Sequence, residues 1–347
     1  MSDPSTTPPA PGAPPADQPQ GVGHIEVDTA EGFGDLDSGF GDTASETTSL
    51  ASSVRNHQYE NGRRYHSYKA GTYLSPNDEQ EADRLDMHHH MMLLQLNGEL
   101  HLAPLDEHFS GRVLDLGAGT GIWAMDMADK YSAAVVTGID LSPVQAQFVP
   151  PNCYFEVDDM EEPWTYRHPF ELIHASWLAG SIRDWDQLVK QCYDNLTPGG
   201  WVEFKDWDYR PRLPDGSLDL PDNTVKKWHK VVMSTAEEKA GRSTTPAVGL
   251  KDRVTKTGFV NVQETVLKTP IGIWPKDPVL KEIGRCYRLA LDEGLEAISL
   301  RMLTQLAGWS TLEAQVLNAD FRKAMKEFPF YHNYHVIYGQ KPPAGTS

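Results

Sequence analysis

The sequence predicts an α/β fold whose sheet is mostly parallel, and three observations lead to this class. Short apolar segments alternate with helical patterns through the middle of the chain, as in a parallel sheet covered by helices. A glycine-rich loop directly follows the first of these segments. The segment 331–341 alternates in polarity and is expected to be the last strand.

The N-terminal segment departs from this pattern. Residues 1–54 contain nine Asp or Glu and no Lys or Arg, with seven prolines in the first nineteen positions. Because it has few large apolar residues, the segment cannot bury enough surface to offset the entropy lost on ordering. We therefore predict a disordered, acidic, proline-rich tail over 1–55 and a single α/β domain over 56–343.

Charge and composition argue against several classes of protein. Nine acids without bases give the tail −9 of the formal net charge of −18, which argues against direct binding of nucleic acid. The three cysteines lie far apart without a CxxC pair, which fits a reducing compartment. No leader-like segment and no run of 18 apolar residues occurs, so we expect an intracellular protein, in the nucleus or cytoplasm, without membrane insertion.

The strongest motif is RVLDLGAGTGIWAMDMA at 112–128, an apolar strand followed by a glycine loop and a helical pattern. Such a unit brings backbone N–H groups close to a bound nucleotide. The nicotinamide fingerprint GxGxxG fails from Gly117, because Ile122 occupies its last position. Counted from Gly119, the first glycine lies two residues beyond the end of the strand.

Further features follow in chain order. The segment AAVVTGID ends at Asp140, nineteen residues after Gly121, where a carboxylate can accept hydrogen bonds from both hydroxyls of a ribose. CYFEVDDMEEPW ends in acids, which could equally form a solvated turn, and FELIHAS ends at Ser176. A helix over about 184–196 then leads into LTPGGW, where Pro-Gly-Gly predicts a turn before a fifth strand.

This order, with the spacing Asp115-x-Gly117-x-Gly119-x-Gly121, resembles that of the class I S-adenosylmethionine methyltransferases. The resemblance implies a Rossmann-like fold with a mostly parallel seven-stranded sheet, S-adenosylmethionine as cofactor and no metal. It places the acid of the first strand and the glycine loop at the methionine portion, the second strand's acid at the ribose, and the third segment at the adenine. The cofactor-binding residues so implied are Asp115, Gly117, Ala118, Gly119, Asp140, Leu141, Asp159, Met160 and Ser176.

The block 60–104 carries a more specific resemblance. ENGRRYH, Tyr73, PNDE, RLD and HH in this block, with GTGIWA and LAGSIRDW further on, resemble the fungal LaeA-like methyltransferases over about 57–210. By this likeness Tyr73 and Arg84 close over the cofactor, the arginine pairing with the methionine carboxylate. If the likeness does not extend to these two residues, Tyr73 is a structural tyrosine and Arg84 an arginine on the surface of a helix.

The family likeness also divides the domain into parts. We expect 56–110 to be an N-terminal helical extension covering the cofactor and 111–208 to be the S-adenosylmethionine-binding core. The remainder, 209–343, should hold a cap insertion, further helices and the final strands. Within it we predict helices near 222–240 and 246–257, a strand near 259–268, and helices over 276–328 with breaks at Gly294 and Gly308.

The run His88-His89-His90 lies in a helix predicted over about 78–96. Neighbouring residues of a helix point about 100° apart, so no two of these imidazoles share a face, unlike the i, i+4 pair of a helical zinc site. We expect no metal here. Packed, hydrogen-bonded and exposed side chains are expected instead, one of them facing the cofactor.

The acceptor side of the site is less defined. Four aromatic residues fall at or beside the carboxyl ends of the strands, where they either line an acceptor pocket or pack the insertion onto the sheet: Trp177, Trp207, Tyr209 and Trp228. His174, His229 and Glu203 are candidates for a general base, but their spacing singles out none of them. The acceptor and its methylated atom remain unspecified.

Two biological roles fit a methyltransferase of this kind. One is a regulator of fungal secondary metabolism with velvet-type protein partners, which the family likeness and the acidic tail favour. The alternative is an enzyme of a biosynthetic cluster that methylates a small metabolite or peptide. The lack of a Lys/Arg import cluster, apart from Arg63-Arg64, favours the second role.

Overall fold

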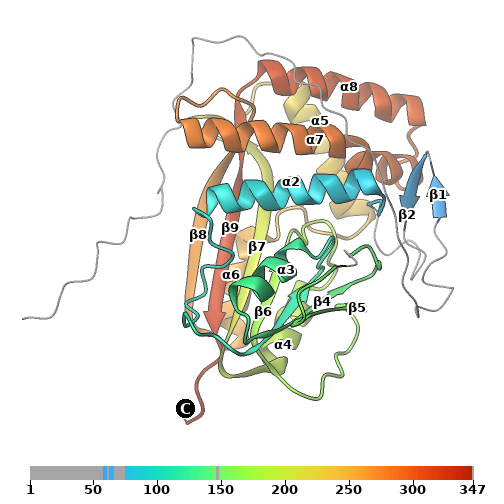
Figure 1. The fold of residues 1–347 in the computed structure, drawn as a ribbon. Coiled ribbons are helices and arrows are strands. Elements are labelled where there is room, and N and C mark those ends of the chain that lie inside the picture. Colours follow the sequence, from blue (N-terminus) through green and yellow to red (C-terminus); the bar gives the residue numbers. More distant parts are fainter. Residues whose placement is uncertain (1–57, 61, 66–74, 146–147, 346–347) are drawn as a thin grey trace, which may run out of the picture.

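The computed structural model describes residues 58–60, 62–65, 75–145 and 148–345 (Figure 1). The predicted tail over 1–55 and Tyr73 lie outside these ranges.

A seven-stranded sheet with the order β5-β4-β3-β6-β7-β9-β8 forms the centre of the molecule. The first five strands in this order pair in parallel, and β9 lies antiparallel between β7 and β8. The predicted sheet, with 331–341 as its last strand, is therefore confirmed. The strands are β3 (Arg112–Leu116), β4 (Val135–Asp140), β5 (Cys153–Val157), β6 (Phe170–Ser176), β7 (Leu196–Arg212), β8 (Val260–Ile271) and β9 (Phe330–Gln340).

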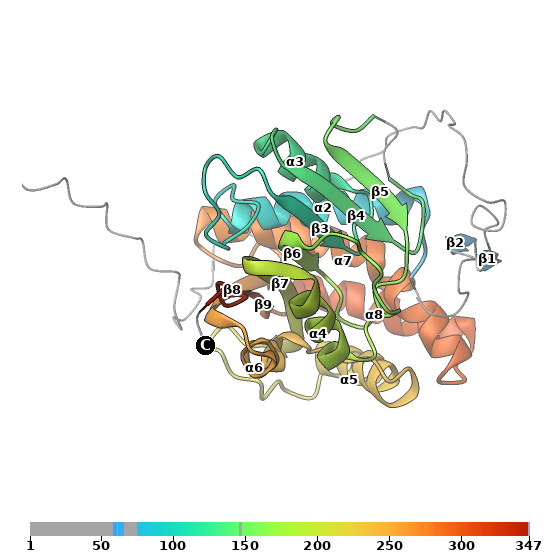
Figure 2. The ribbon, with the colours of Figure 1, turned by 90° about the horizontal axis from the view of Figure 1, so that it is seen from below.

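Helices cover both faces of the sheet, as the view from below shows (Figure 2). α3 (Ile122–Lys130) packs on one face, and α4 (Trp185–Asn195) and α6 (Ala247–Thr257) pack on the other. The central strands β3 and β6 are buried almost throughout, as expected of parallel strands covered on both faces.

A helical layer, here called the cap, lies over the carboxyl ends of the parallel strands (Figure 1). Within it α2 packs on α7, and α7 on α8. Its apolar core includes Trp207 of β7 together with Tyr287 and Phe321 from two of the helices. The elements of the cap are α2 (Glu79–Gln95), α5 (Thr224–Ser234), the π-helix η1 (Thr235–Lys239), α7 (Pro278–Gln305) and α8 (Thr311–Glu327).

The predicted break at Gly294 is wrong, because α7 runs through this residue without interruption. A Cβ atom built on Gly294 would lie 2.7 Å from Cδ of Arg84 on α2. The glycine therefore permits a close approach of two helices rather than ending one. The break at Gly308 is confirmed: this residue has φ 75° and lies between α7 and α8.

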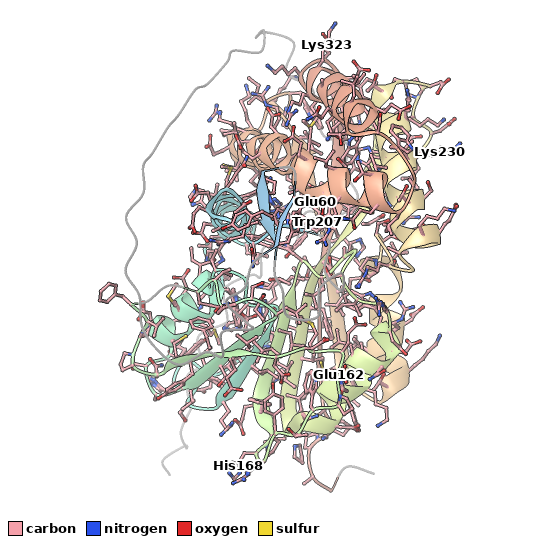
Figure 3. All side chains as sticks on the ribbon, turned by 90° about the vertical axis from the view of Figure 1, so that its right-hand side faces the viewer. Glu60, Glu162, His168, Trp207, Lys230 and Lys323 are labelled. Atoms are coloured by element: carbon pink, nitrogen blue, oxygen red, sulfur yellow. The ribbon has the colours of Figure 1, made fainter. Side chains whose placement is uncertain are left out.

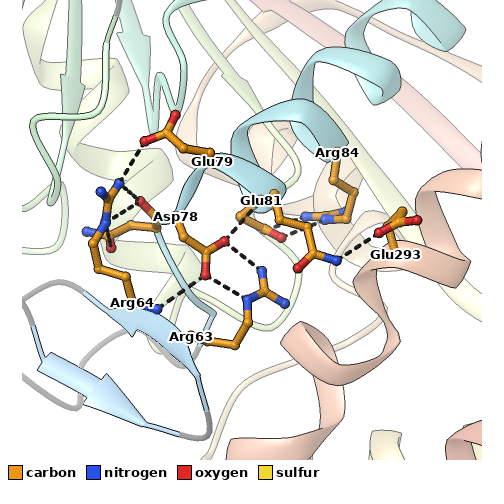
Figure 4. Close-up of polar contacts among 9 residues, drawn as sticks. Arg63, Arg64, Asp78, Glu79, Glu81, Arg84 and Glu293 are labelled. Carbon is orange, nitrogen blue, oxygen red and sulfur yellow. Dashed lines mark hydrogen bonds and ion pairs between the residues drawn. The ribbon is translucent and has the colours of Figure 1, made fainter. Parts of the chain in front are cut away.

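A short hairpin precedes α2, formed by β1 (Gln58–Glu60) and β2 (Arg63–Tyr65), and the sequence did not predict it. Figure 4 shows Arg63 reaching Asp78, with bonds of 2.6 and 2.8 Å from its Nε and Nη2. Asp78 is the N-cap of α2 and also accepts the N–H of Glu81 at 3.1 Å. One carboxylate thus begins the helix and fastens the hairpin to it.

The other predicted elements lie close to their expected positions. The helix expected over 222–240 is present as α5 followed by the π-helix. The Pro-Gly-Gly segment bulges out of β7, because Leu196 pairs with Phe170 and the next pairing joins Trp201 to Leu172. In the part of the chain that the structure describes, no helix is apolar over a length sufficient to cross a membrane.

Candidate functional site

The glycine loop between β3 and α3 needs glycine for two reasons. Gly117, Gly119 and Gly121 have φ of 71°, 55° and 83°, a left-handed conformation that costs other residues about 1–2 kcal/mol. A Cβ atom at Gly121 would also overlap the ring of Phe155. The turn is therefore tight, and its backbone lies open to the space above the sheet.

That space is a cavity, here called the first cavity, between the loop and α2. Of the eleven predicted cofactor-binding residues, nine line it: Asp115, Gly117, Ala118, Gly119, Asp140, Leu141, Asp159, Met160 and Ser176. They come from the carboxyl ends of β3, β4 and β6 and from the segment after β5. The structure thus brings together residues that the sequence spreads over 62 positions.

Carboxylates dominate the polar lining of the first cavity. Asp140 accepts the N–H of Gly119 at 3.0 Å and that of Ser142 at 2.9 Å, so it also fixes the glycine loop. Asp159 accepts the N–H of Glu161 at 3.0 Å. Among the described residues on this wall, Lys205 is the only Lys or Arg. An acidic cavity of this kind suits a cationic ligand that also donates hydrogen bonds.

Asp115 forms the floor of the first cavity and is bonded to a buried histidine. Its Oδ1 lies 2.7 Å from Nδ1 of His174, and Trp123 stacks on the imidazole at 3.5 Å between ring centroids. Burial raises the pKa of Asp115 to about 7 and lowers that of His174 well below its usual value. The pair is therefore kept at low charge inside the protein.

The N-cap and one face of α2 form the opposite wall of the first cavity, where the sequence had led us to expect only Arg84 and a histidine. The spacing of the lining residues, three, four and seven positions, is that of one helix face, a signal that the sequence does contain. The residues are Asp78, Glu81, Ala82, Leu85, His89 and Met92.

The three consecutive histidines of α2 enter three different environments. His88 is buried against a second cavity, described below, and His89 lines the first cavity and lies 2.7 Å from Asp126 on α3. His90 is exposed. Within the described residues, no three His, Cys, Asp or Glu side chains gather in a way that could hold a metal ion.

Arg84 lies elsewhere than the family likeness led us to expect. It does not line the first cavity but the second, and two of its nitrogens bond Glu81 at 2.6 and 2.8 Å (Figure 4). A third nitrogen lies 3.0 Å from Nε2 of His88. The reason is the position of Arg84 on the face of α2 that meets α7, where its side chain packs against Gly294.

The second cavity lies beside the first, under the cap, and has a similar volume, about 150 Å³ against 160 Å³. Leu85, Trp177 and Ser181 line both. All four aromatic residues noted at the strand ends line the second cavity: Trp177, Trp207, Tyr209 and Trp228. Trp207 is fully buried, and in the view of Figure 3 its label lies between the sheet below and the helices of the cap above.

Trp177, at the boundary of the two cavities, is held in an unusual backbone conformation. Its φ is 59°, which is costly for a bulky residue. The buried carboxylate of Asp206 fixes the segment by accepting the N–H groups of Leu178 (3.0 Å), Ala179 (3.2 Å) and Trp207 (2.8 Å). The fold therefore maintains this strain where the two cavities meet.

None of the three candidate bases offers a free lone pair to either cavity. His174 and Glu203 line neither. His229 lines the second cavity, but its Nδ1 donates to the carbonyl of Val225 at 2.8 Å. Its Nε2 must then accept a bond, and Nε2 of His332 lies 2.8 Å away, with the hydroxyl of Tyr287 donating to Nδ1 of His332.

Comparison with known proteins gives consistent results. The profile of a methyltransferase domain matches residues 74–264. Methyltransferase pytC of Aspergillus terreus is 43% identical over 311 residues, which cover 89% of this chain and 95% of pytC. Secondary metabolism regulator LAE1 of Cochliobolus heterostrophus is 38% identical, covering 82% of this chain and 94% of its own. The protein-methionine methyltransferase laeA of Emericella nidulans is 35% identical, covering 82% and 76%.

Solved structures that resemble this one have low sequence identity to it. Phosphoethanolamine N-methyltransferase 2 of Haemonchus contortus has a TM-score of 0.43 and 19% identity, covering 78% of this chain and 54% of that one. The [4+2]-cyclase SpnF has a TM-score of 0.44 and 16% identity, covering 73% and 82%.

Proposed function

The chain belongs to the fungal LaeA-like family of S-adenosylmethionine-dependent methyltransferases, and we propose that the first cavity holds the cofactor and the second holds the methyl acceptor. S-adenosylmethionine supplies a methyl group on a positively charged sulfur. The single observation that carries the proposal is the shared wall: Leu85, Trp177 and Ser181 face both cavities. A donor and an acceptor seated on either side of this wall would be neighbours.

The hydrogen-bond acceptors of the first cavity suit this cofactor. Asp140 stands at the end of β4, where a carboxylate can accept from the ribose hydroxyls, and Asp159 and Met160 stand where the adenine would lie. The backbone of Gly117 to Gly119 and the acid of Asp115 would lie near the methionine portion. The acidic wall favours a sulfonium cation over an uncharged ligand.

The chain itself contributes mainly alignment. Holding two reactants at near-attack distance can supply roughly 7–11 kcal/mol of the barrier. The cap and Trp177 would provide this by fixing the acceptor against the donor, and their apolar surface would exclude water from the reacting atoms.

We propose a small apolar or planar compound as the acceptor, because the second cavity is lined by side chains from well inside the fold. Trp207, Phe321 and His332 on its wall are each no more than 1% exposed. The higher identity to pytC than to the regulators is in keeping with this role.

A regulator of secondary metabolism, with velvet-type partners and a nuclear or cytoplasmic site of action, is the second candidate function. The regulator names of several relatives at 33–38% identity favour it. Incubating the protein with radiolabelled S-adenosylmethionine and an extract of host cells separates the two. Label in the small-molecule fraction supports the biosynthetic enzyme, and label confined to protein supports the regulator.

Calorimetry on Asp140→Ala tests the cofactor assignment. The variant should bind S-adenosylmethionine at least about tenfold more weakly, because two ribose hydroxyls and the N–H of Gly119 lose their acceptor. The matched control is Asp194→Ala, which removes an acid of α4 that is paired with Lys190 and lines neither cavity. Equal affinities for the wild type and Asp140→Ala would refute the assignment.

A further inference from the structure

His88 presents an unused hydrogen-bond donor at the second cavity. The guanidinium of Arg84 can only donate, so the contact of 3.0 Å to Nε2 makes that nitrogen an acceptor and leaves the proton on Nδ1. Burial, and then the charge of Arg84, lower the pKa of His88 well below its usual value, so the ring is neutral. Its Nδ1–H is buried and has no partner among the residues that the structure describes.

A second N–H donor on the wall of this cavity is also buried without a partner. The indole Nε1–H of Trp207 is buried without a partner in the described part of the chain. A buried N–H group left unpaired costs about 1–3 kcal/mol, so a ligand oxygen that satisfies it gains affinity. The rings of His88 and Trp207 lie close together, with centroids 6.4 Å apart.

The charges around the second cavity favour one sign of ligand. Arg84, which is paired with Glu81 of the first cavity, is the one charged side chain among the described residues that line the second cavity, and no Asp or Glu lines it. Burial lowers the pKa of both His229 and His332, which therefore stay neutral. An ammonium group would find no carboxylate here, whereas an anionic oxygen would find N–H donors.

The described residues that line the cavity also offer no free general base. His229 and His88 both use their lone pairs inside the protein, on His332 and Arg84. An acceptor that must lose a proton during transfer, such as a simple alcohol, would have no group to take it. An acceptor that is already ionised in solution would need none.

From these observations, and resting on the proposed function, we infer that the second cavity selects an oxygen acid ionised at neutral pH, a carboxylic acid or an acidic enol on an apolar body, with Nδ1–H of His88 donating to its oxygen. In the transfer, the anionic oxygen forms the new O–CH₃ bond while the S–CH₃ bond breaks. The electron pair of that bond stays on sulfur. The positive and negative charges cancel, so the products are a neutral ester or enol ether and a neutral thioether, and no proton moves.

The test compares probes that share one planar apolar body. Protein saturated with S-adenosylhomocysteine is titrated by calorimetry with 2-naphthoate, 2-naphthylmethylamine and 2-(methylthio)naphthalene. We expect 2-naphthoate to bind at least tenfold more tightly than either of the others. Failure of S-adenosylhomocysteine to bind would count against the proposed function itself, whereas its binding without discrimination among the probes would overturn only this inference.

Variants of His88 assign the preference to its nitrogen. In His88→Phe the ring remains without the donor, and the preference for 2-naphthoate should fall to less than threefold. In His88→Asn the amide nitrogen stands close to the position of Nδ1, so most of the preference should return. The matched control is His90→Phe, an exposed neighbour on the same helix, which should behave as the wild type. Full preference in His88→Phe would overturn the role of this residue.

A rate ratio tests the missing base. Transfer to 2-naphthol and to 2-naphthoate is compared from pH 6 to 9, because the phenol and carboxylic acid ionise near pH 10 and 4, as tyrosine and glutamate do. Dividing one rate by the other cancels titrations of the protein, such as those of Asp115 and Asp206, whose pKa burial raises to about 7. The naphthol-to-naphthoate ratio should rise about tenfold per pH unit. A flat ratio would show that the protein supplies a base.

Discussion

The two cavities lie against the same wall, yet the chain builds them in different ways. The first is lined mainly by strand ends and a glycine loop that follow one another over 115–182 and by one face of α2, with Lys205 of β7 and Tyr334 of β9 added. The second gathers aromatic and apolar side chains from α2, β7, α5, α7, α8 and β9. The first has carboxylates with backbone partners, and the second has neutral rings and unpaired N–H groups.

This difference indicates where specificity can change. A cofactor site built from local motifs varies little without losing the fold, because its glycines and acids also form the turns. An acceptor site assembled from the cap can vary through single side chains while the sheet stays intact. The four predictions below test this division, beginning with the largest effect.

Gly121→Ala should damage the first cavity most. The left-handed φ costs about 1–2 kcal/mol for alanine, and displacing the Phe155 ring adds about 1–3 kcal/mol, so the free energy of unfolding should fall by about 2–5 kcal/mol. The matched control is Gly98→Ala, which has φ 85° but no atom within 4 Å of the added Cβ, and should lose about 1–2 kcal/mol. Urea unfolding measures both. Equal losses would show that Phe155 does not constrain the loop.

Asp115→Asn should change how stability depends on pH. Burial raises the pKa of Asp115 to about 7, whereas an unfolded aspartate titrates near 3.9. Between these values the folded state keeps a proton that the unfolded state has lost, so this group's contribution to stability falls as pH rises toward 7. Asparagine does not titrate and can still accept from Nδ1 of His174.

In protein without cofactor, the free energy of unfolding of the variant minus that of the wild type should therefore rise by about 1–3 kcal/mol between pH 5 and pH 8. Because the pKa of His174 is lowered, both proteins lose stability at acid pH. This loss is common to the two and cancels in the difference between their free energies of unfolding. Urea unfolding at each pH gives the measurement. A difference that is constant with pH would mean that Asp115 is ionised in the folded protein.

The sequence predicted most where the fold depends on local patterns. The sheet and its last strand are confirmed, and the nine residues that line the first cavity lie at strand ends and in the glycine loop, which are short-range signals. The break expected at Gly294 is wrong, and Arg84 lines the second cavity, for one shared reason: α2 packs closely on α7, which no local pattern encodes. His229 and His332 are 103 positions apart, so their contact could not be read from the sequence.

Trp207→Phe should lower the rate of methyl transfer while leaving cofactor binding nearly unchanged, which distinguishes the roles of the two cavities. Trp207 is fully buried and stacks on Tyr287, with ring centroids 4.8 Å apart, so the smaller ring leaves a gap beside the acceptor. Transfer to 2-naphthoate should fall about tenfold, or about 1.4 kcal/mol, while the affinity for S-adenosylmethionine stays within about twofold. The matched control is Trp185→Phe, another buried tryptophan that lines neither cavity. The Trp185→Phe variant should lose stability but keep its activity. Equal activity in the two variants would show that Trp207 has only a structural role.

Removal of residues 1–54 should have the smallest effect of all. Both cavities, as described, are lined by residues from Ser75 onward, and the removed segment has too few large apolar residues to add to either. A protein beginning at Arg55 should keep its melting temperature within about 1 °C and bind S-adenosylmethionine and 2-naphthoate within about twofold of the full chain. Thermal unfolding and calorimetry on the two proteins give the comparison. A weaker affinity for one ligand alone would be the most informative contradiction, because it would show which of the two cavities the acidic segment completes.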